Sequence, residues 1–290
     1  MTFRAADSDT SEVSIRTTDV LRVRDETVQG QDHIAVEEPL EIQIGFGNGS
    51  EHQHRSISVT MRTPGRDFEL AAGFLFTEGV ISGADDIQGI DYCAPSSKEG
   101  FRNTVRVELR PGVEIDFSRL QRHFYTSSSC GVCGKSSIEA VGAGRPILRP
   151  SPGPALQTSV VHSLPQTIRA AQPIFESTGG LHASALFMAD GSPVLICEDV
   201  GRHNALDKVI GTMLLQNRVP LEGHLLLVSG RVSFELVQKA LMAGIPALAA
   251  VGAPSTLAVE LARKYGMTLL GFVRDGRFNV YSGDERIVAG

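Results

Sequence analysis

The sequence predicts a two-domain α/β protein, with a small N-terminal α+β domain followed by a larger α/β domain. Before about residue 110, four stretches with the alternation typical of strands surround one stretch with helical spacing. After about residue 160, strands and helices follow one another in turn. Strands joined through helices need crossover connections, which favour a mostly parallel or mixed sheet with helices on both faces.

This pattern divides the chain into four ranges. Residues 1–12 are polar and are expected to form a disordered tail, and residues 13–115 form the small α+β domain. Residues 116–160 hold a short helical stretch, a loop with two cysteines and a connector rich in proline and glycine. Residues 161–290 form the α/β domain.

The N-terminal domain is expected to contain one helix packed on strands. The helix is predicted over 67–79, because apolar residues recur there at helical spacing and Gly79 follows them. The strands alternate between apolar and polar residues and cover 14–23, 35–44, 55–62 and 103–110.

The later elements follow in order. A short helix is predicted over 117–124, and a turn at Asp190 and Gly191 joins two strands within 182–198. The longer helices are predicted over 163–180, 204–217, 233–244 and 256–266. The remaining strands are predicted over 224–230, 245–252, 268–274 and 278–283.

Composition and charge argue against several classes of function. The chain has 290 residues and a formal net charge of -6, which argues against a nucleic-acid-binding surface. The N-terminus has no apolar core of a signal peptide, and the apolar runs are too short to cross a bilayer. We therefore expect a cytoplasmic protein with neither nucleic acid nor a membrane as partner. In that compartment a disulfide framework is not expected, and Cys93 and Cys197 are interpreted as small buried residues.

The strand predicted over 224–230 runs directly into a polar turn and a helix. In open α/β sheets, ligands bind beyond the carboxyl ends of strands. Hydroxyl groups, free backbone N–H groups and an arginine at a helix N-terminus suit a phosphate. The sequence V-S-G-R is not a phosphate-binding Walker motif, so the prediction depends on these residue types and on their position at a strand end. The candidate ligands are Ser229, Gly230, Arg231 and Ser233.

A second strand end carries two arginines, an aspartate and a glycine. The aspartate can accept hydrogen bonds from the N1–H and N2–H₂ groups of guanine, and the arginines can meet phosphates. Asp275 and Gly276 are also a common pair in a hairpin turn, and taken alone the turn is the favoured interpretation. The candidate segment consists of Val273, Arg274, Asp275, Gly276, Arg277 and Phe278.

The densest polar segment is CEDVGRHNALDK, residues 197–208, and His182 lies upstream of it. A histidine among carboxylates is typical of a metal or acid–base site. The segment also opens a helix, where aspartate commonly caps and lysine commonly faces solvent. That structural interpretation is favoured for Asp207 and Lys208, whereas the roles of His182, Arg202 and His203 stay open.

The pair Cys130 and Cys133 lies in SSSCGVCGKSS. A structural zinc site needs four ligands, and no second C-x-x-C pair exists. A thioredoxin-type redox pair would follow a strand in a βαβ unit, whereas this pair follows a predicted helix. A thiol close to a lysine and a helix N-terminus is nucleophilic and can accept sulfur as a persulfide. From spacing alone, the three alternatives stay open.

Several motifs together resemble the formate dehydrogenase accessory sulfurtransferase family, FdhD. The resemblance runs from about residue 33 to the end of the chain. It is carried by EEPLEIQI, TPGRDFELAAGFLFTEGVI, SSSCGVCGKSS, GGLHASALF, CEDVGRHNALDKVIG, VSGRVSFELVQKALMAGIP and GFVRDGRFNVYSG.

The resemblance implies a cytoplasmic sulfurtransferase, typically a homodimer. It takes sulfur from a cysteine desulfurase and passes it to the molybdenum cofactor of formate dehydrogenase. The persulfide would form on Cys130, with Cys133 as partner. The bis-molybdopterin guanine dinucleotide form of the cofactor would bind at 273–278, which favours the ligand interpretation there. A non-catalytic carrier or chaperone of this cofactor is the alternative.

The resemblance also implies a C-terminal three-layer α/β/α domain similar to the cytidine deaminase fold. Zinc deaminases use H-x-E followed by P-C-x-x-C. Here His182 lies in H-A-S, without that glutamate, and the C-x-x-C lies upstream. We therefore expect no deaminase chemistry, no zinc and no metal ligands.

Overall fold

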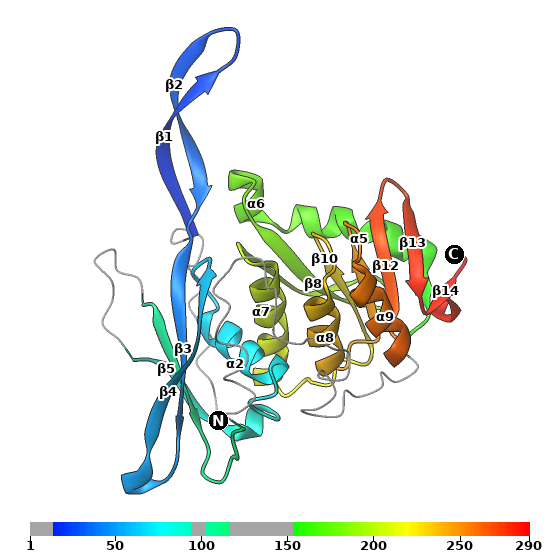
Figure 1. The fold of residues 1–290 in the computed structure, drawn as a ribbon. Helices are drawn as coiled ribbons and strands as arrows, with labels where there is room; N and C mark the ends of the chain where they lie inside the picture. The colour runs from blue at the N-terminus through cyan, green and yellow to red at the C-terminus, as the bar shows by residue number, and fades with distance from the viewer. Residues whose placement is uncertain (1–13, 94–101, 117–152) are drawn as a thin grey trace.

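The computed structural model describes residues 14–93, 102–116 and 153–290 (Figure 1). Most of the described chain forms two sheets with helices between and around them. The predictions for the tail, for a helix over 117–124, for the cysteine loop and for most of the connector lie outside the described residues.

The N-terminal domain contains a four-stranded sheet covered on one face by a helix. Strand β3 pairs with β4 in the antiparallel sense and with β6 in the parallel sense, and the strand order is β4-β3-β6-β5. Leu40, Ile42 and Ile44 alternate along β3 and are fully buried, as expected for a strand with one buried face. The elements are β3 (Glu38–Phe46), β4 (Gln53–Arg62), α2 (Asp67–Thr77), β5 (Ile87–Tyr92) and β6 (Thr104–Leu109).

A separate two-stranded ribbon precedes this sheet and projects from the body of the molecule (Figure 1). It consists of β1 (Ile15–Val23) and β2 (Thr27–Ala35), which pair in the antiparallel sense. The prediction of a strand over 14–23 is confirmed. Strand β2 was not predicted, because its sequence TVQGQDHIA is polar and largely exposed.

The C-terminal domain contains a six-stranded mixed sheet in the order β13-β12-β11-β10-β8-β9. Strands β10, β11 and β12 are parallel, and the other pairings are antiparallel. The predicted mixed sheet is therefore confirmed. Its strands are β8 (His182–Met188), β9 (Pro193–Asp199), β10 (His224–Val228), β11 (Ala247–Ala250), β12 (Thr268–Arg274) and β13 (Arg277–Ser282).

Helices cover both faces of this sheet, so the predicted three layers are confirmed. Helix α5 (Thr158–Ala170) packs on one face through Val161, Leu164 and Ile168. The opposite face is covered by α7 (Arg202–Leu215), α8 (Phe234–Met242) and α9 (Thr256–Tyr265). The specific likeness to the cytidine deaminase fold stays a prediction.

One predicted helix, over 163–180, is two helices in the structure. They are α5 (Thr158–Ala170) and α6 (Pro173–Thr178), with the break before Pro173, which has no backbone N–H to continue α5. Helix α5 begins inside the range assigned to the connector. The short strands β7 (Leu156–Gln157) and β14 (Ile287–Val288) pair with each other, so the end of the connector belongs to the C-terminal domain.

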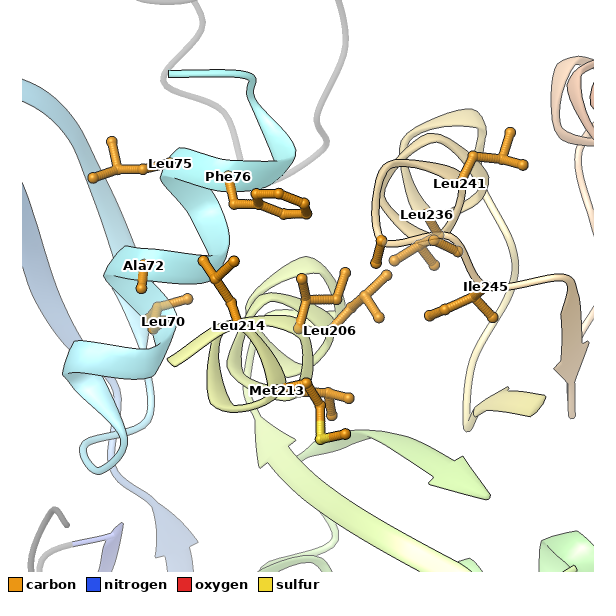
Figure 2. Packing of buried hydrophobic residues seen from close by; sticks show 14 of the residues in the cluster. Leu70, Ala72, Leu75, Phe76, Leu206, Met213, Leu214, Leu236, Leu241 and Ile245 are labelled. Atoms are coloured by element: carbon orange, nitrogen blue, oxygen red, sulfur yellow. The ribbon is translucent and has the colours of Figure 1, made fainter. Parts of the chain in front are cut away.

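The two domains share one hydrophobic core. Helix α7 lies between α2 and α8, and apolar side chains from all three helices meet there (Figure 2). Leu75 and Phe76 of α2 and Leu214 of α7 belong to this core. The contact places the beginning of α7 next to the loop after β4.

Across the described ranges, no helix is both long and apolar enough to cross a membrane.

Candidate functional site

The candidate site lies at the edge of the six-stranded sheet where its parallel strands end. The segments after β9, β10 and β11 lead into the N-termini of α7, α8 and α9 at this edge. Backbone N–H groups in the first turn of a helix are unpaired and carry partial positive charge. Three helix N-termini at one sheet edge therefore favour an anionic ligand.

The predicted segment after β10 lies at this edge. The Ser229 hydroxyl accepts a hydrogen bond from the Ala183 N–H (2.9 Å), which joins the end of β10 to the beginning of β8. A Cβ atom at Gly230 would lie 3.3 Å from Nδ1 of His182, so the glycine lets the histidine approach the backbone. Arg231 is exposed and is available to a ligand.

The histidines and the arginine whose roles were open belong to the same edge. His203, in the first turn of α7, has its Nε2 atom 3.2 Å from Oγ of Ser233, the residue before α8. The half-buried Arg202 lies close enough to lower the pKa values of His182 and His203 by charge repulsion, although burial is the larger cause for both. Their positions at strand and helix ends were the sequence signal, but their mutual contacts required the fold.

The lowered pKa of His203 predicts that the stability of the protein depends on pH. Burial, with Lys239 and Arg202 nearby, lowers its pKa from 6.5 to about 4. The unfolded chain takes up this proton first as pH falls below 6.5, so the contribution to stability is present above that pH and is lost toward pH 4. The upper bound of this contribution to the free energy of unfolding is about 3 kcal/mol.

Urea unfolding of wild type and His203→Gln at about pH 7.5 and about pH 4.5 measures this contribution. Glutamine can still pair with Ser233 but does not titrate. The variant is expected to lose less stability than wild type on acidification. Equal losses in the two proteins would contradict the assignment.

A buried ion pair holds the beginning of α7. Lys208 Nζ lies 2.7 Å from a carboxylate oxygen of Asp199, and both side chains are almost fully buried. The same carboxylate accepts hydrogen bonds from the backbone N–H groups of Thr63 (3.2 Å) and Gly201 (2.8 Å). Thr63 follows β4, so the pair connects the N-terminal domain to the site.

The prediction that Asp207 caps a helix and that Lys208 faces solvent was wrong. Neither residue faces solvent, since Asp207 is 1% and Lys208 2% exposed, and Asp207 forms an ion pair with Lys239 (2.8 Å). The physical reason is the position of α7 between the sheet and two helices, which buries most of its circumference. Both residues are structural, as the favoured interpretation held, although not as a cap or a solvated lysine.

Asp275 and Gly276 form the two-residue turn of the β12–β13 hairpin. Both have positive φ, 54° and 67°, and Arg274 pairs with Arg277 across the turn. The hairpin interpretation is therefore confirmed, and it leaves the side chains of both arginines and Asp275 exposed. Among the other predicted residues, the Val273 side chain is fully buried in the core under α5 and can offer a ligand only its backbone. Phe278 is half-buried, with its ring centroid 5.3 Å from that of His162.

The two predicted ligand segments are connected across the sheet edge by backbone hydrogen bonds. The Gly252 N–H donates to the Gly230 carbonyl (3.1 Å), and the Phe272 N–H donates to the Gly252 carbonyl (3.0 Å). A Cβ atom at Gly252 would lie 2.9 Å from the Gly230 oxygen, so a glycine is needed for this close approach. The loop after β11 therefore lies between the two segments and holds them in fixed order.

The predicted nucleophiles, Cys130 and Cys133, lie outside the described residues. Cys197 is buried, as predicted, and burial raises its pKa to about 11, which keeps it an unreactive thiol. The expectation of burial for Cys93 was wrong, since it follows the end of β5 and is exposed. Within the described ranges, the possible ligand atoms of one group of side chains, His52, His54 and Glu108, all lie within 4.8 Å of one another, and this group belongs to the N-terminal sheet.

The fold and this edge define a mixed α/β protein with a polar, glycine-lined surface suited to an anionic ligand. Residues 35–288 match the model of the FdhD/NarQ family. The chain therefore belongs to the FdhD/NarQ family.

Relatives and a solved structure agree with this assignment. The chain is 51% identical over 272 residues to a protein of Streptomyces avermitilis named sulfur carrier protein FdhD, covering 92% of this chain and 94% of that protein. A protein of Mycolicibacterium paratuberculosis with the same name is 51% identical over 88% of this chain and 91% of its own length. A crystal structure described as a formate dehydrogenase accessory protein of Desulfotalea psychrophila matches with a TM-score of 0.71 and 25% identity, over 95% of this chain and all of that one.

Proposed function

We propose that this protein is a sulfur carrier that serves the maturation of formate dehydrogenase. It accepts sulfur from a cysteine desulfurase as a persulfide on Cys130. It then passes the sulfur to the molybdenum cofactor, in its bis-molybdopterin guanine dinucleotide form, which is a substrate here. The observation that carries the proposal is the 51% identity, over nearly the whole chain, to a protein named as a sulfur carrier.

The acceptance step is an exchange at sulfur. The Cys130 thiolate attacks the outer sulfur of the donor's persulfide, a new S–S bond forms, and the donor cysteine leaves as a thiolate. Release follows when the Cys133 thiolate attacks Sγ of Cys130. The sulfur then leaves as hydrosulfide, and the two cysteines, which supply the two electrons for its reduction, are oxidised to a disulfide. An external dithiol must reduce this disulfide before the next cycle.

The described sheet edge supports binding of a cofactor that carries phosphates and guanine. Arg231, Arg274 and Arg277 are exposed at or beside the edge and can pair with phosphate oxygens. The exposed Asp275 carboxylate is suited to the donor groups of guanine. The arrangement combines helix N-termini with arginines, which is the usual composition of a phosphate site.

Intact mass spectrometry after incubation with an active cysteine desulfurase and cysteine tests the carrier step. Wild type is expected to gain about 32 Da per sulfur in a form that a thiol reductant removes. Cys130→Ala should show no gain. A gain in the Cys130→Ala variant equal to that of wild type would contradict the mechanism.

The exposed arginines favour one alternative, a carrier or chaperone that binds the cofactor without sulfur chemistry. Under this alternative, Cys130→Ser would still support an active formate dehydrogenase and Arg274→Ala would not. The sulfur-carrier proposal predicts that Cys130→Ser abolishes that support. Comparing the two variants in cells that lack the wild-type protein separates the two functions.

A further inference from the structure

Two histidines and a glutamate meet on the N-terminal sheet, on the face turned away from α2. His52 directly precedes β4 in extended conformation and His54 is the second residue of β4, so their side chains leave the same side of the chain. Glu108 lies on β6, where Val107 and Leu109 are buried on the α2 side and Glu108 points to the other side. The cluster is close to the tip of the β3–β4 hairpin, because His54 belongs to the second-last residue pair before the connection between these strands.

The strand register explains how these side chains meet across an intervening strand. His54 pairs with Gly45 on β3, and Gly45 pairs with Glu108 on β6, so the three residues form one row. A Cβ atom at Gly45 would lie 1.9 Å from Oε2 of Glu108, so the carboxylate occupies the space that any other residue would fill. The glycine therefore lets the glutamate reach over β3 toward the histidines.

The three donor groups already have separations typical of metal ligands. Nε2 of His52 lies 3.0 Å and Nε2 of His54 lies 3.6 Å from the Glu108 carboxylate, and the ligand atoms all lie within 4.8 Å of one another. Metal–ligand bonds of about 2.0 Å in a tetrahedron place ligands about 3.3 Å apart. Two imidazoles and a carboxylate are a common three-residue zinc set that leaves one position open.

A cationic group already lies beside this cluster. Nη1 of Arg106 lies 3.2 Å from Nε2 of His54 and 3.8 Å from a Glu108 oxygen. The guanidinium can only donate, so Nε2 of His54 is an acceptor with its lone pair directed at a positive charge. Nε of Arg106 is buried and has no hydrogen-bond partner among the described residues, which indicates that this position does not satisfy the arginine fully.

We propose that His52, His54 and Glu108 bind one divalent transition-metal ion, with Zn²⁺ as the preferred occupant and water in the open position. Arg106 is the competing cation and moves aside when the ion binds. Imidazole nitrogen suits zinc, copper and nickel, whereas a site for Mg²⁺ or Ca²⁺ would consist of oxygen ligands. The proposal departs from our expectation of no metal ligands and does not depend on the sulfur chemistry of Cys130.

Zinc binding by the full, untagged chain tests this site. Cys93, Cys130 and Cys133 are first replaced with serine, so that thiolates cannot hold the ion. Equilibrium dialysis against buffered Zn²⁺, with elemental analysis, then gives stoichiometry and affinity. We expect one ion per chain, with His54→Ala and Glu108→Gln each weakening affinity by roughly tenfold or more.

His33→Ala is the matched control, because His33 is an exposed histidine on β2, outside this cluster. It should bind zinc with the parent affinity. Absence of binding in the parent that carries the three serine substitutions, or equal affinity in His54→Ala, would overturn the site. Arg106→Gln should bind several-fold more tightly, and an affinity no higher than the parent's would contradict the role given to the arginine. Circular dichroism of each variant separates lost binding from lost folding.

Discussion

Replacing Gly73 with alanine is expected to destabilise this protein strongly, although alanine is the better helix former. Gly73 lies inside α2 where this helix crosses α7. A Cβ atom there would lie 1.9 Å from the backbone oxygen of Asp207. The contact is reciprocal, since a Cβ atom at Gly211 of α7 would lie 1.8 Å from the backbone oxygen of Glu69. The two helix backbones touch directly, and neither can yield by rotating a side chain.

The sign of the effect distinguishes close packing from helix propensity. In an exposed helix, glycine to alanine stabilises by about 1 kcal/mol. Here the added methyl group must push α2 and α7 apart, and overpacking costs about 1–3 kcal/mol, occasionally more. Urea unfolding should therefore show a clearly lower midpoint for Gly73→Ala and for Gly211→Ala.

Gly223→Ala is a suitable control, because a Cβ atom at Gly223 would meet nothing within 4 Å. Its stability should stay within about 0.5 kcal/mol of wild type. An unchanged or raised midpoint for Gly73→Ala would show that the helices separate easily. The orientation of α7, and with it the positions of Arg202 and His203, would then not depend on this crossing.

Periodicity was sufficient to predict most of the fold. Buried strands such as β10 and amphipathic helices such as α9 carry strong patterns, and their predicted positions are confirmed within a few residues. Strands β2 and β5 were missed for physical reasons. Strand β2 is polar and mostly exposed, whereas β5 has only six residues and contains a glycine.

The candidate site was predictable only in part. The rule that ligands bind at the carboxyl ends of strands identified 229–233 and 273–278 from the sequence. The fold places them at one edge, with the loop at Gly252 between them. The contact of His203 with Ser233 joins residues thirty positions apart, and no local pattern indicates it.

The cluster of His52, His54 and Glu108 could not be predicted for a related reason. His54 and Glu108 meet only because two strand pairings place Gly45 between them, and sequence spacing carries no information about that register. The burial of Lys208 and Lys239 could not be predicted from the sequence either. Charged residues on a helix are usually exposed, and only the packing of α7 between other helices reverses this expectation.

Lys239→Met is expected to be among the most destabilising single substitutions on α8. The Lys239 ammonium contacts both carboxylate oxygens of Asp207 on α7, at 2.8 and 3.0 Å. It also donates to the Thr77 hydroxyl (2.8 Å) and the Glu78 carboxylate (3.3 Å) at the end of α2. One buried cation thus joins three helices, including the two that position the site.

Removing the lysine leaves Asp207, 1% exposed, with a charge that neither water nor an ammonium compensates. Breaking a buried pair from one side costs about 3–5 kcal/mol, because the remaining charge is desolvated and unpaired. Asp207→Asn should also destabilise, since it leaves Lys239 with Glu78 as its remaining ion-pair partner. The double variant should lose clearly less than the sum of the two single losses, because it no longer contains an unpaired charge at this position.

Urea unfolding of the four proteins gives the interaction energy of the pair directly. Glu285→Gln is the control, because it breaks an ion pair in which Glu285 is 67% exposed, and it should cost less than about 1 kcal/mol. Additive losses in the double variant would mean that water reaches Asp207 when Lys239 is absent. The junction of α2, α7 and α8 would then be held by apolar contacts, and the ion pair would determine only how the three helices are aligned.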